Sequence, residues 1–194
     1  MNEVNRCGWE GSDPVYIAYH DNEWGIPEHN DRKLFEMLIL EGMQAGLSWI
    51  TILRKRENFR AAFNNFDPEK VAAYDDTKIT ELLQNAGIIR NRGKITAAVT
   101  NAQHFLEIQR EFGSFDAFIW KFVDFKPIIN HFETLAEVPA KTELSDKISA
   151  ELKKRGFKYV GSTIIYSFMQ AVGMVNDHLV FCFCHTDNGK LQRN

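Results

Sequence analysis

Cysteine and histidine occur in two pairs near opposite ends of the chain, Cys7 with His20 and His178 with Cys182. Two thiolates and two imidazoles make a complete tetrahedral ligand set for zinc, and four protein ligands leave no open position for a catalytic water. The pattern therefore predicts one structural zinc ion that ties the two ends of the chain together. The alternative is an isolated buried cysteine with surface histidines, and spacing alone does not decide between the two.

Apart from these cysteines and histidines, Glu41 is the residue that could take part in chemistry. It lies between an apolar stretch, residues 38–40, and a glycine-bounded turn that leads to Trp49. A carboxylate at such a place is a candidate for burial, and a buried carboxylate needs a compensating partner from the protein or from a ligand. The alternative interpretation is an exposed glutamate near the end of a helix.

Four aromatic residues surround the first metal-ligand pair in the sequence, namely Trp9, Tyr16, Tyr19 and Trp24. Aromatic residues in such a place commonly pack around a metal or form part of the core. They are equally suited to line a slot that stacks a planar ligand.

A basic, glycine-bounded turn covers residues 153–161 and contains Lys154, Arg155, Gly156, Lys158 and Gly161. A tight turn that leads into a helix exposes backbone N–H groups and the positive end of a helix dipole, which suits a phosphate group. The basic side chains would add charge. The alternative is an ordinary corner between two helices with glycine at the end of the first helix.

Helical patterns dominate the elements that must position these residues. Apolar spacing and capping signals predict helices over about 31–46, 48–63, from 68, 76–87, 92–112, 114–123, 145–155 and 161–172. Alternation typical of strands is weak, and residues 127–141 are expected to form an irregular connection between two lobes. The sequence therefore predicts an all-α protein with about eight or more helices.

Composition limits the remaining choices. The 194 residues are 44% hydrophobic with a formal net charge of −3, which is typical of one globular domain and gives no general sign of a nucleic-acid partner. Short basic runs at 54–56, 90–94 and 153–158 are either solvated helix faces or one phosphate-facing patch. Three cysteines argue against a disulfide framework, and we find no leader or membrane span, so a reducing intracellular compartment is expected. Cys184 and His185 are alternative ligands to the second metal pair.

Six segments together resemble the 3-methyladenine DNA glycosylase I family of bacterial alkylation-repair enzymes. They are residues 6–9 (RCGW), 16–25 (YIAYHDNEWG), 40–49 (LEGMQAGLSW), 86–92 (AGIIRNR), 155–161 (RGFKYVG) and 170–178 (QAVGMVNDH). The resemblance extends from about residue 6 to residue 182. It departs mildly at Met43, where a polar residue is expected, and in the tail after Cys182.

The resemblance implies a helix–hairpin–helix glycosylase fold with two lobes in a single domain over 1–194. The hairpin motif would cover about 145–172, and a zinc-binding terminal lobe would combine 1–30 with 173–194. Cys7, His20, His178 and Cys182 match the family's zinc ligands. Gly156, Lys158, Gly161, Lys154 and Arg155 would contact the DNA backbone.

In the same way, Glu41 matches the family's base-recognition residue and is the expected catalytic residue. Tyr16, Tyr19 and Trp49 match its aromatic base pocket. The family is described as lacking the catalytic aspartate that many relatives carry downstream of the hairpin, so Asp177 is interpreted as structural support beside His178.

The implied activity is hydrolytic removal of 3-methyladenine from alkylated double-stranded DNA without strand cleavage, with free 3-methyladenine as the product. A monomer in the bacterial cytoplasm, associated with the nucleoid through DNA and with no membrane partner, is expected. Two rival hypotheses remain: a non-catalytic module that binds damaged DNA through the same hairpin, and a zinc-stabilised enzyme that acts on small molecules.

Overall fold

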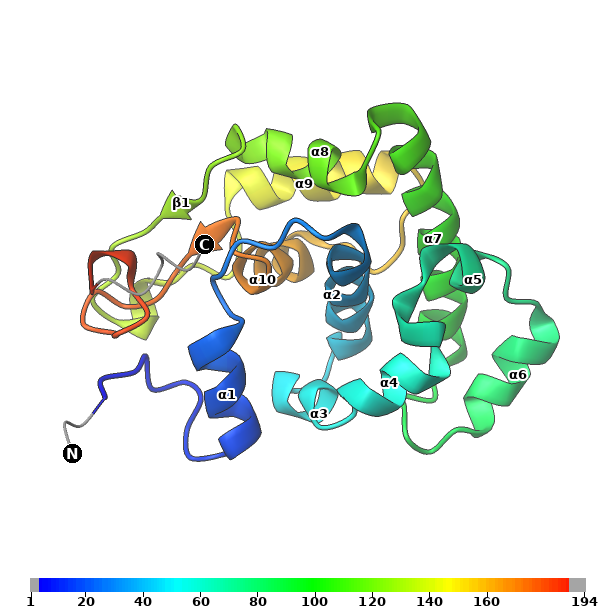
Figure 1. The fold of residues 1–194 in the computed structure, drawn as a ribbon, viewed down its shortest axis with the longest axis horizontal. Coiled ribbons are helices and arrows are strands. Elements are labelled where there is room, and N and C mark those ends of the chain that lie inside the picture. The colour runs from blue at the N-terminus through cyan, green and yellow to red at the C-terminus, as the bar shows by residue number, and fades with distance from the viewer. Residues whose placement is uncertain (1–3, 189–194) are drawn as a thin grey trace.

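Helices dominate the computed structural model, which describes residues 4–188 (Figure 1). The α-helices are α1 (Pro14–Asn22), α2 (Asp31–Gln44), α3 (Trp49–Leu53), α4 (Arg56–Ala62), α5 (Pro68–Ala72), α6 (Asp76–Gln84), α7 (Arg92–Phe112), α8 (Phe115–Trp120), α9 (Glu143–Lys154) and α10 (Ser162–Ala171). The 3-10 helices are η1 (Asn64–Phe66), η2 (Lys121–Val123), η3 (Leu135–Glu137) and η4 (Thr186–Asn188). Two short strands, β1 (Ile128–Ile129) and β2 (Val175–Asn176), pair in parallel. The predicted, predominantly helical class is confirmed.

The central element is α2, which follows its capping residue Asn30 and is buried on all sides over residues 34–43. The Asn30 side chain accepts hydrogen bonds from the N–H groups of Arg32 and Lys33 and so caps the helix start. Helices α7, α8 and α10 pack around α2, as Figure 1 shows. A helix that is enclosed in this way holds its polar residues in fixed positions, and Glu41 lies in its last turn.

Most predicted helix boundaries agree with the structure, because capping residues mark them. Asp67 followed by Pro68 opens α5 as expected, and α7 covers 92–112 as predicted. The predicted helix over 48–63 is wrong in one respect, since it is divided into α3 and α4 at Arg54 and Lys55. Helix α1 was not predicted, although Asp13 followed by a proline is the same capping signal that opens α5.

Helices α9 and α10 meet at the predicted basic turn. The predicted start of α9 at Ser145 or Asp146 is wrong, because Thr142 caps this helix by a reciprocal pair of hydrogen bonds with Ser145. Gly156 ends the turn after α9 with φ +96°, and a Cβ atom there would lie 2.4 Å from Nε2 of His104 on α7. The corner therefore requires glycine both for its backbone conformation and for its close approach to α7.

The two ends of the described chain lie side by side (Figure 1). The N–H of Phe183 donates to the carbonyl of Asn5 at 2.9 Å. Gly173 comes after the end of α10, has φ +69° and packs against Ile26. A Cβ atom at Gly173 would lie 2.3 Å from the carbonyl carbon of Ile26. The chain after α10 is thereby directed back to the N-terminal segment.

Within residues 4–188, none of the helices has both the length and the apolar character needed to cross a membrane.

Candidate active site and metal centre

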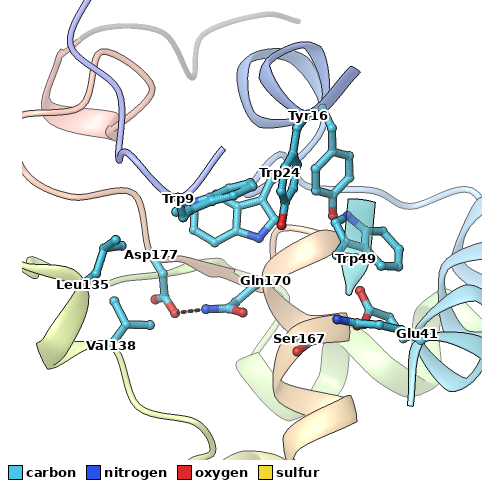
Figure 2. Close-up of a pocket in the computed structure, with 12 residues that line it drawn as sticks. Trp9, Tyr16, Trp24, Glu41, Trp49, Leu135, Val138, Ser167, Gln170 and Asp177 are labelled. Atoms are coloured by element: carbon cyan, nitrogen blue, oxygen red, sulfur yellow. Dashed lines mark hydrogen bonds between the residues drawn. The ribbon is translucent and has the colours of Figure 1, made fainter. Parts of the chain in front are cut away.

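A cavity of about 240 Å³ opens between α1, the end of α2, the start of α3 and one face of α10 (Figure 2). All four residues predicted to bind the base line it. The full lining is Trp9, Tyr16, Tyr19, Trp24, Glu41, Gln44, Trp49, Leu135, Val138, Ser167, Gln170 and Asp177. The structure therefore brings residues from five segments of the chain around one open cavity.

Glu41 is buried, with a side chain that reaches the cavity from α2. Its Oε2 atom is buried and has no hydrogen-bond partner among the described residues. Burial raises the pKa of this carboxyl group to about 8, because the low-dielectric interior disfavours the charged form. Of the two interpretations that the sequence left open, the structure has the buried glutamate, and with this pKa its carboxyl group is mostly protonated at neutral pH.

Aromatic rings form the wall opposite α10. The ring centroid of Trp9 lies 4.9 Å from that of Tyr16 and 5.0 Å from that of Trp24, and Tyr19 lies 5.5 Å from Trp49. The indole N–H groups of Trp9 and Trp49 are buried without a hydrogen-bond partner. These rings provide π-faces for a flat ligand, and the two unpaired N–H groups are donors available to it.

One wall of the cavity contains residues that sequence reasoning did not identify as pocket residues. Leu135 and Val138 come from the predicted irregular connection, and Ser167 and Gln170 come from α10. Asp177 is buried and accepts three hydrogen bonds, from Asn130 Nδ2 at 2.7 Å, Tyr166 Oη at 2.6 Å and Gln170 Nε2 at 2.8 Å. For the two α10 residues the available signal was the three-residue helical spacing of Ser167 and Gln170, and it does not show what they face.

The four predicted zinc ligands lie together. Sγ of Cys182 is 3.5 Å from Nδ1 of His178 and 3.6 Å from Nε2 of His20, and Sγ of Cys7 is 3.5 Å from Nδ1 of His178. All four donor atoms lie within 4.8 Å of one another. A tetrahedral zinc ion with its usual bond lengths would separate sulfur from nitrogen by about 3.6 Å, so this donor set fits zinc.

Each histidine of this cluster is held in the tautomer that a metal requires. Nδ1 of His20 donates to Oδ1 of Asp21 at 2.8 Å, and Asp21 is fixed in turn by Arg6. Nε2 of His178 donates to the carbonyl of Trp24 at 3.0 Å. With these outer nitrogens occupied, the other ring nitrogens present lone pairs to the centre of the cluster.

The thiol of Cys182 has a pKa well below its usual range, because its sulfur accepts hydrogen bonds from the neighbouring Cys184 and from Cys7 of the cluster. A depressed pKa favours the thiolate, which is the form that binds a metal. Cys184 and His185, the alternative ligands, are both buried, and neither belongs to the four-residue cluster.

The cluster and the cavity share a wall. The ring of Trp24 lies 4.6 Å from that of His178, and the ring of Trp9 lies 5.2 Å from that of His20. Both tryptophans also line the cavity. The position of this wall therefore depends on the order of the cysteine–histidine cluster.

The basic turn does not line the cavity. Lys154 and Lys158 are exposed, and Gly161 begins α10 with no atom within 4 Å of where a Cβ would lie. Asn101 on α7 holds the turn by accepting from the Lys158 N–H and donating to its carbonyl. Arg155 differs, because its guanidinium group pairs with Glu111 at 2.6 Å and with Glu151 at 2.8 Å.

Comparison with known proteins agrees with this arrangement. The methyladenine glycosylase family matches residues 9–185. The chain is 56% identical to DNA-3-methyladenine glycosylase 1 of Escherichia coli, over 95% of this chain and 99% of that protein. It is 51% identical to DNA-3-methyladenine glycosylase of Haemophilus influenzae, over 94% and 99%.

Solved structures are equally similar. A crystal structure of 3-methyladenine DNA glycosylase I has a TM-score of 0.91 and 57% identity, covering 93% of this chain and 100% of that one. A structure of the Staphylococcus aureus enzyme that concerns 3-methyladenine recognition has a TM-score of 0.89 and 38% identity, covering 92% and 95%. The family, the relatives and the fold agree over nearly the whole chain, and the protein belongs to the methyladenine glycosylase family.

Proposed function

We propose that this protein is a base-excision-repair glycosylase that removes 3-methyladenine from alkylated double-stranded DNA by hydrolysis of the N-glycosyl bond. The observation that carries this proposal is the buried, unpartnered Glu41 carboxyl group in a cavity with aromatic walls. The relatives named above support the same substrate.

The size and chemistry of the cavity suit a single base that has left the DNA helix. An enzyme that acts on a base must first extrude it from the duplex, at a cost of a few kcal/mol that is smaller for a damaged base. Methylation at N3 gives adenine a positive charge, which makes it a good leaving group that needs no protonation. The rings of Trp9, Tyr16 and Trp24 offer stacking and cation–π attraction to such a base.

Glu41 provides the charge that distinguishes the damaged base from adenine. A cationic ligand in contact with its carboxyl group would favour the ionised form, and the pair would form a charge-assisted hydrogen bond. Neutral adenine offers no such compensation. Tight binding of the cation does not by itself speed the reaction, because only stabilisation specific to the transition state does so. Glu41 would contribute to catalysis by opposing the positive charge that develops on the sugar.

Hydrolysis without strand cleavage is the expected outcome, since strand cleavage by a glycosylase of this kind requires an amine nucleophile. Among the described residues, the cavity lining contains no lysine. The nearby Lys94 donates instead to the carbonyls of Met43 and Ala45, at 2.9 and 2.6 Å, where it fixes the end of α2.

We propose further that Cys7, His20, His178 and Cys182 hold one structural zinc ion, and that the fold is of the helix–hairpin–helix type. Zinc would supply a fixed four-ligand junction and no catalytic water. The cluster geometry and the occupied outer nitrogens of both histidines support this assignment.

The exposed Lys154 and Lys158 and the open space beside Gly161 support contact between the turn and the DNA backbone. Arg155 was predicted to share this role. Its two ion pairs favour a role in fixing the turn to α7, and its contact with DNA stays a prediction. The monomeric state and the bacterial cytoplasmic location stay predictions as well.

The test is chromatographic resolution of the bases released from methylated duplex DNA by the wild type and by Glu41→Gln. The proposal predicts that the wild type releases 3-methyladenine, that Glu41→Gln does not, and that neither protein cleaves the strand. Binding of methylated DNA without release of a base, by folded wild-type protein, would contradict the proposal and support a non-catalytic binding module.

A further inference from the structure

The cavity has a second polar wall, formed by Gln170 and Asp177, which the proposed reaction has not used. Gln170 projects from α10 into the cavity, and its Nε2 donates to Oδ2 of Asp177 at 2.8 Å (Figure 2). The amide oxygen points away from Asp177 in the same view. Among the described residues, this oxygen has no hydrogen-bond partner.

The orientation of this amide is fixed by its surroundings. Asp177 is buried, and its carboxylate also accepts from Tyr166 Oη at 2.6 Å and from Asn130 Nδ2 at 2.7 Å. An ionised carboxylate only accepts hydrogen bonds. A reversed amide would therefore place its oxygen against an anion, so the Gln170 amide can present only its oxygen to the cavity.

This arrangement makes the second polar wall an acceptor. Glu41, when ionised, is a second acceptor that reaches the cavity from α2, beside the part of α10 that carries Ser167 (Figure 2). A base with an amino group offers hydrogen atoms to both acceptors, whereas a base with a carbonyl at the same position would face the Gln170 oxygen with a second oxygen. Sites built around fixed polar groups reject such analogues strongly, because a buried polar atom is left without a partner.

From this geometry we infer that Gln170, oriented by Asp177, is a specificity-determining residue. It accepts a hydrogen bond from the amino-bearing edge of an alkylated adenine and disfavours alkylated guanine, which carries a carbonyl there. Asp177 acts through Gln170 and is a positioning residue. The inference rests on the proposed function, because it concerns the choice among damaged bases at the same site.

The experiment measures kcat/KM for release of 3-methyladenine and of 3-methylguanine from the same methylated duplex. Gln170→Leu removes the acceptor and keeps much of the side-chain volume. Release of 3-methyladenine should fall by roughly tenfold to one hundredfold, as expected for one lost hydrogen bond to a charged ligand. Release of 3-methylguanine should change much less, so the ratio of the two values should fall by a similar factor. Gln103→Leu, on the exposed side of α7, is the matched control and should leave the ratio unchanged.

Asp177→Asn provides a second test if Gln170→Leu does not fold. Its amide can donate to the Gln170 oxygen, which would reverse the Gln170 amide and present an N–H group to the cavity. The ratio should then move toward 3-methylguanine while zinc content stays at the wild-type value. A ratio that is unchanged in a folded variant, or an equal loss for both bases, would overturn the inference. A wild type that releases no base would instead overturn the proposed function, so the two failures are distinguishable.

Discussion

The cysteine–histidine cluster and the base cavity share two tryptophans but differ in how their buried polar atoms are paired. In the cluster, the outer nitrogens of His20 and His178 each have a hydrogen-bond partner, and the inner donor atoms face one another. In the cavity, the Oε2 atom of Glu41 and the indole N–H groups of Trp9 and Trp49 have none.

Unpaired buried polar atoms cost free energy, of the order of 1–3 kcal/mol for each neutral group. A protein keeps such atoms where a ligand pairs with them. The complete cluster is therefore suited to stabilise the fold, and the incomplete cavity is suited to bind something. Because Trp9 and Trp24 contact both sites, the shape of the cavity depends on the order of the cysteine–histidine cluster.

Loss of the metal cluster should have the largest effect. Cys182→Ser removes one of four ligands, and structural zinc sites contribute on the order of 10 kcal/mol in small domains. We expect zinc content to fall from one per chain to near zero and the melting temperature to fall by more than about 10 °C. Metal analysis and thermal unfolding measure both quantities.

Cys184→Ser is the matched control, because Cys184 is also buried but lies outside the four-residue cluster. It should keep one zinc ion per chain. If Cys184→Ser lost the metal and Cys182→Ser kept it, the ligand assignment would be wrong.

Glu41→Gln should have the next largest effect, on activity. It removes the negative charge from the cavity, so the rate of 3-methyladenine release should fall by about 10²- to 10³-fold. A loss of this size is typical when one group that stabilises charge in the transition state is removed. Single-turnover assays measure this rate. Glu36→Gln is a control on the same helix, since Glu36 pairs with Arg60 away from the cavity. Equal losses in both variants would contradict a specific role for Glu41.

The same substitution should raise stability at neutral pH. The pKa of Glu41 is about 8 in the folded protein, above its unfolded value, so the folded state binds more protons between these pH values. Stability of the wild type therefore falls as pH rises toward 8, by roughly 3 kcal/mol at pH 7 relative to low pH. Glu41→Gln should lack this loss. Denaturant unfolding at pH 5 and pH 8 checks it, and an identical pH dependence in both proteins would refute it.

The dependence of activity on pH should also report the ionisation of the Glu41 carboxyl group. If only ionised Glu41 recognises the cationic base, kcat/KM for the wild type should fall about tenfold per pH unit below the pKa of Glu41. Above a pH of about 8 the profile should level off. The residual activity of Glu41→Gln should show no such dependence. A flat wild-type profile between pH 6 and 8 would exclude this titration.

The smallest effects should come from the basic turn. Lys158→Ala removes one exposed charge, so DNA affinity should fall by several-fold and the slope of log affinity against log salt should decrease by about 1. Lys70→Ala, on the exposed face of α5, is the control. Fluorescence anisotropy over a range of salt concentrations measures both. An unchanged salt slope in Lys158→Ala would place the DNA elsewhere.

Sequence predicted the cavity better on one side than on the other. Local pattern indicated Glu41 as a candidate for burial and Tyr16 and Tyr19 as part of an aromatic cluster, whereas the pocket role of Trp49 came from the family resemblance alone. The wall formed by α10 was not found. Ser167 and Gln170 look like ordinary polar positions on a helix, and only packing against the turn after α2 and the 127–141 connection makes them line a cavity.

The prediction of the helices had the same limit, because contacts between distant segments cannot be read from local sequence patterns. Capping residues predicted most helix boundaries, because they act locally, as Asp67 and Asn30 do. The start of α9 was misplaced because Thr142 and Ser145 are both capping residues and their reciprocal pairing decides which comes first. Glycine at 156 was indicated locally as the end of a helix, but its close approach to His104 on α7 is a contact that no local pattern reveals.

The most direct test of the central claim is the pKa of the Glu41 carboxyl group, measured by carbon-13 NMR on zinc-loaded protein with and without 3-methyladenine. A buried, unpartnered group predicts a pKa near 8 in the free protein. In the complex, the pKa should fall below that value, because the amino group of the neutral free base donates a hydrogen bond that stabilises the ionised carboxylate. A pKa at the ordinary value for glutamate in the free protein, or one that the ligand does not change, would contradict the account.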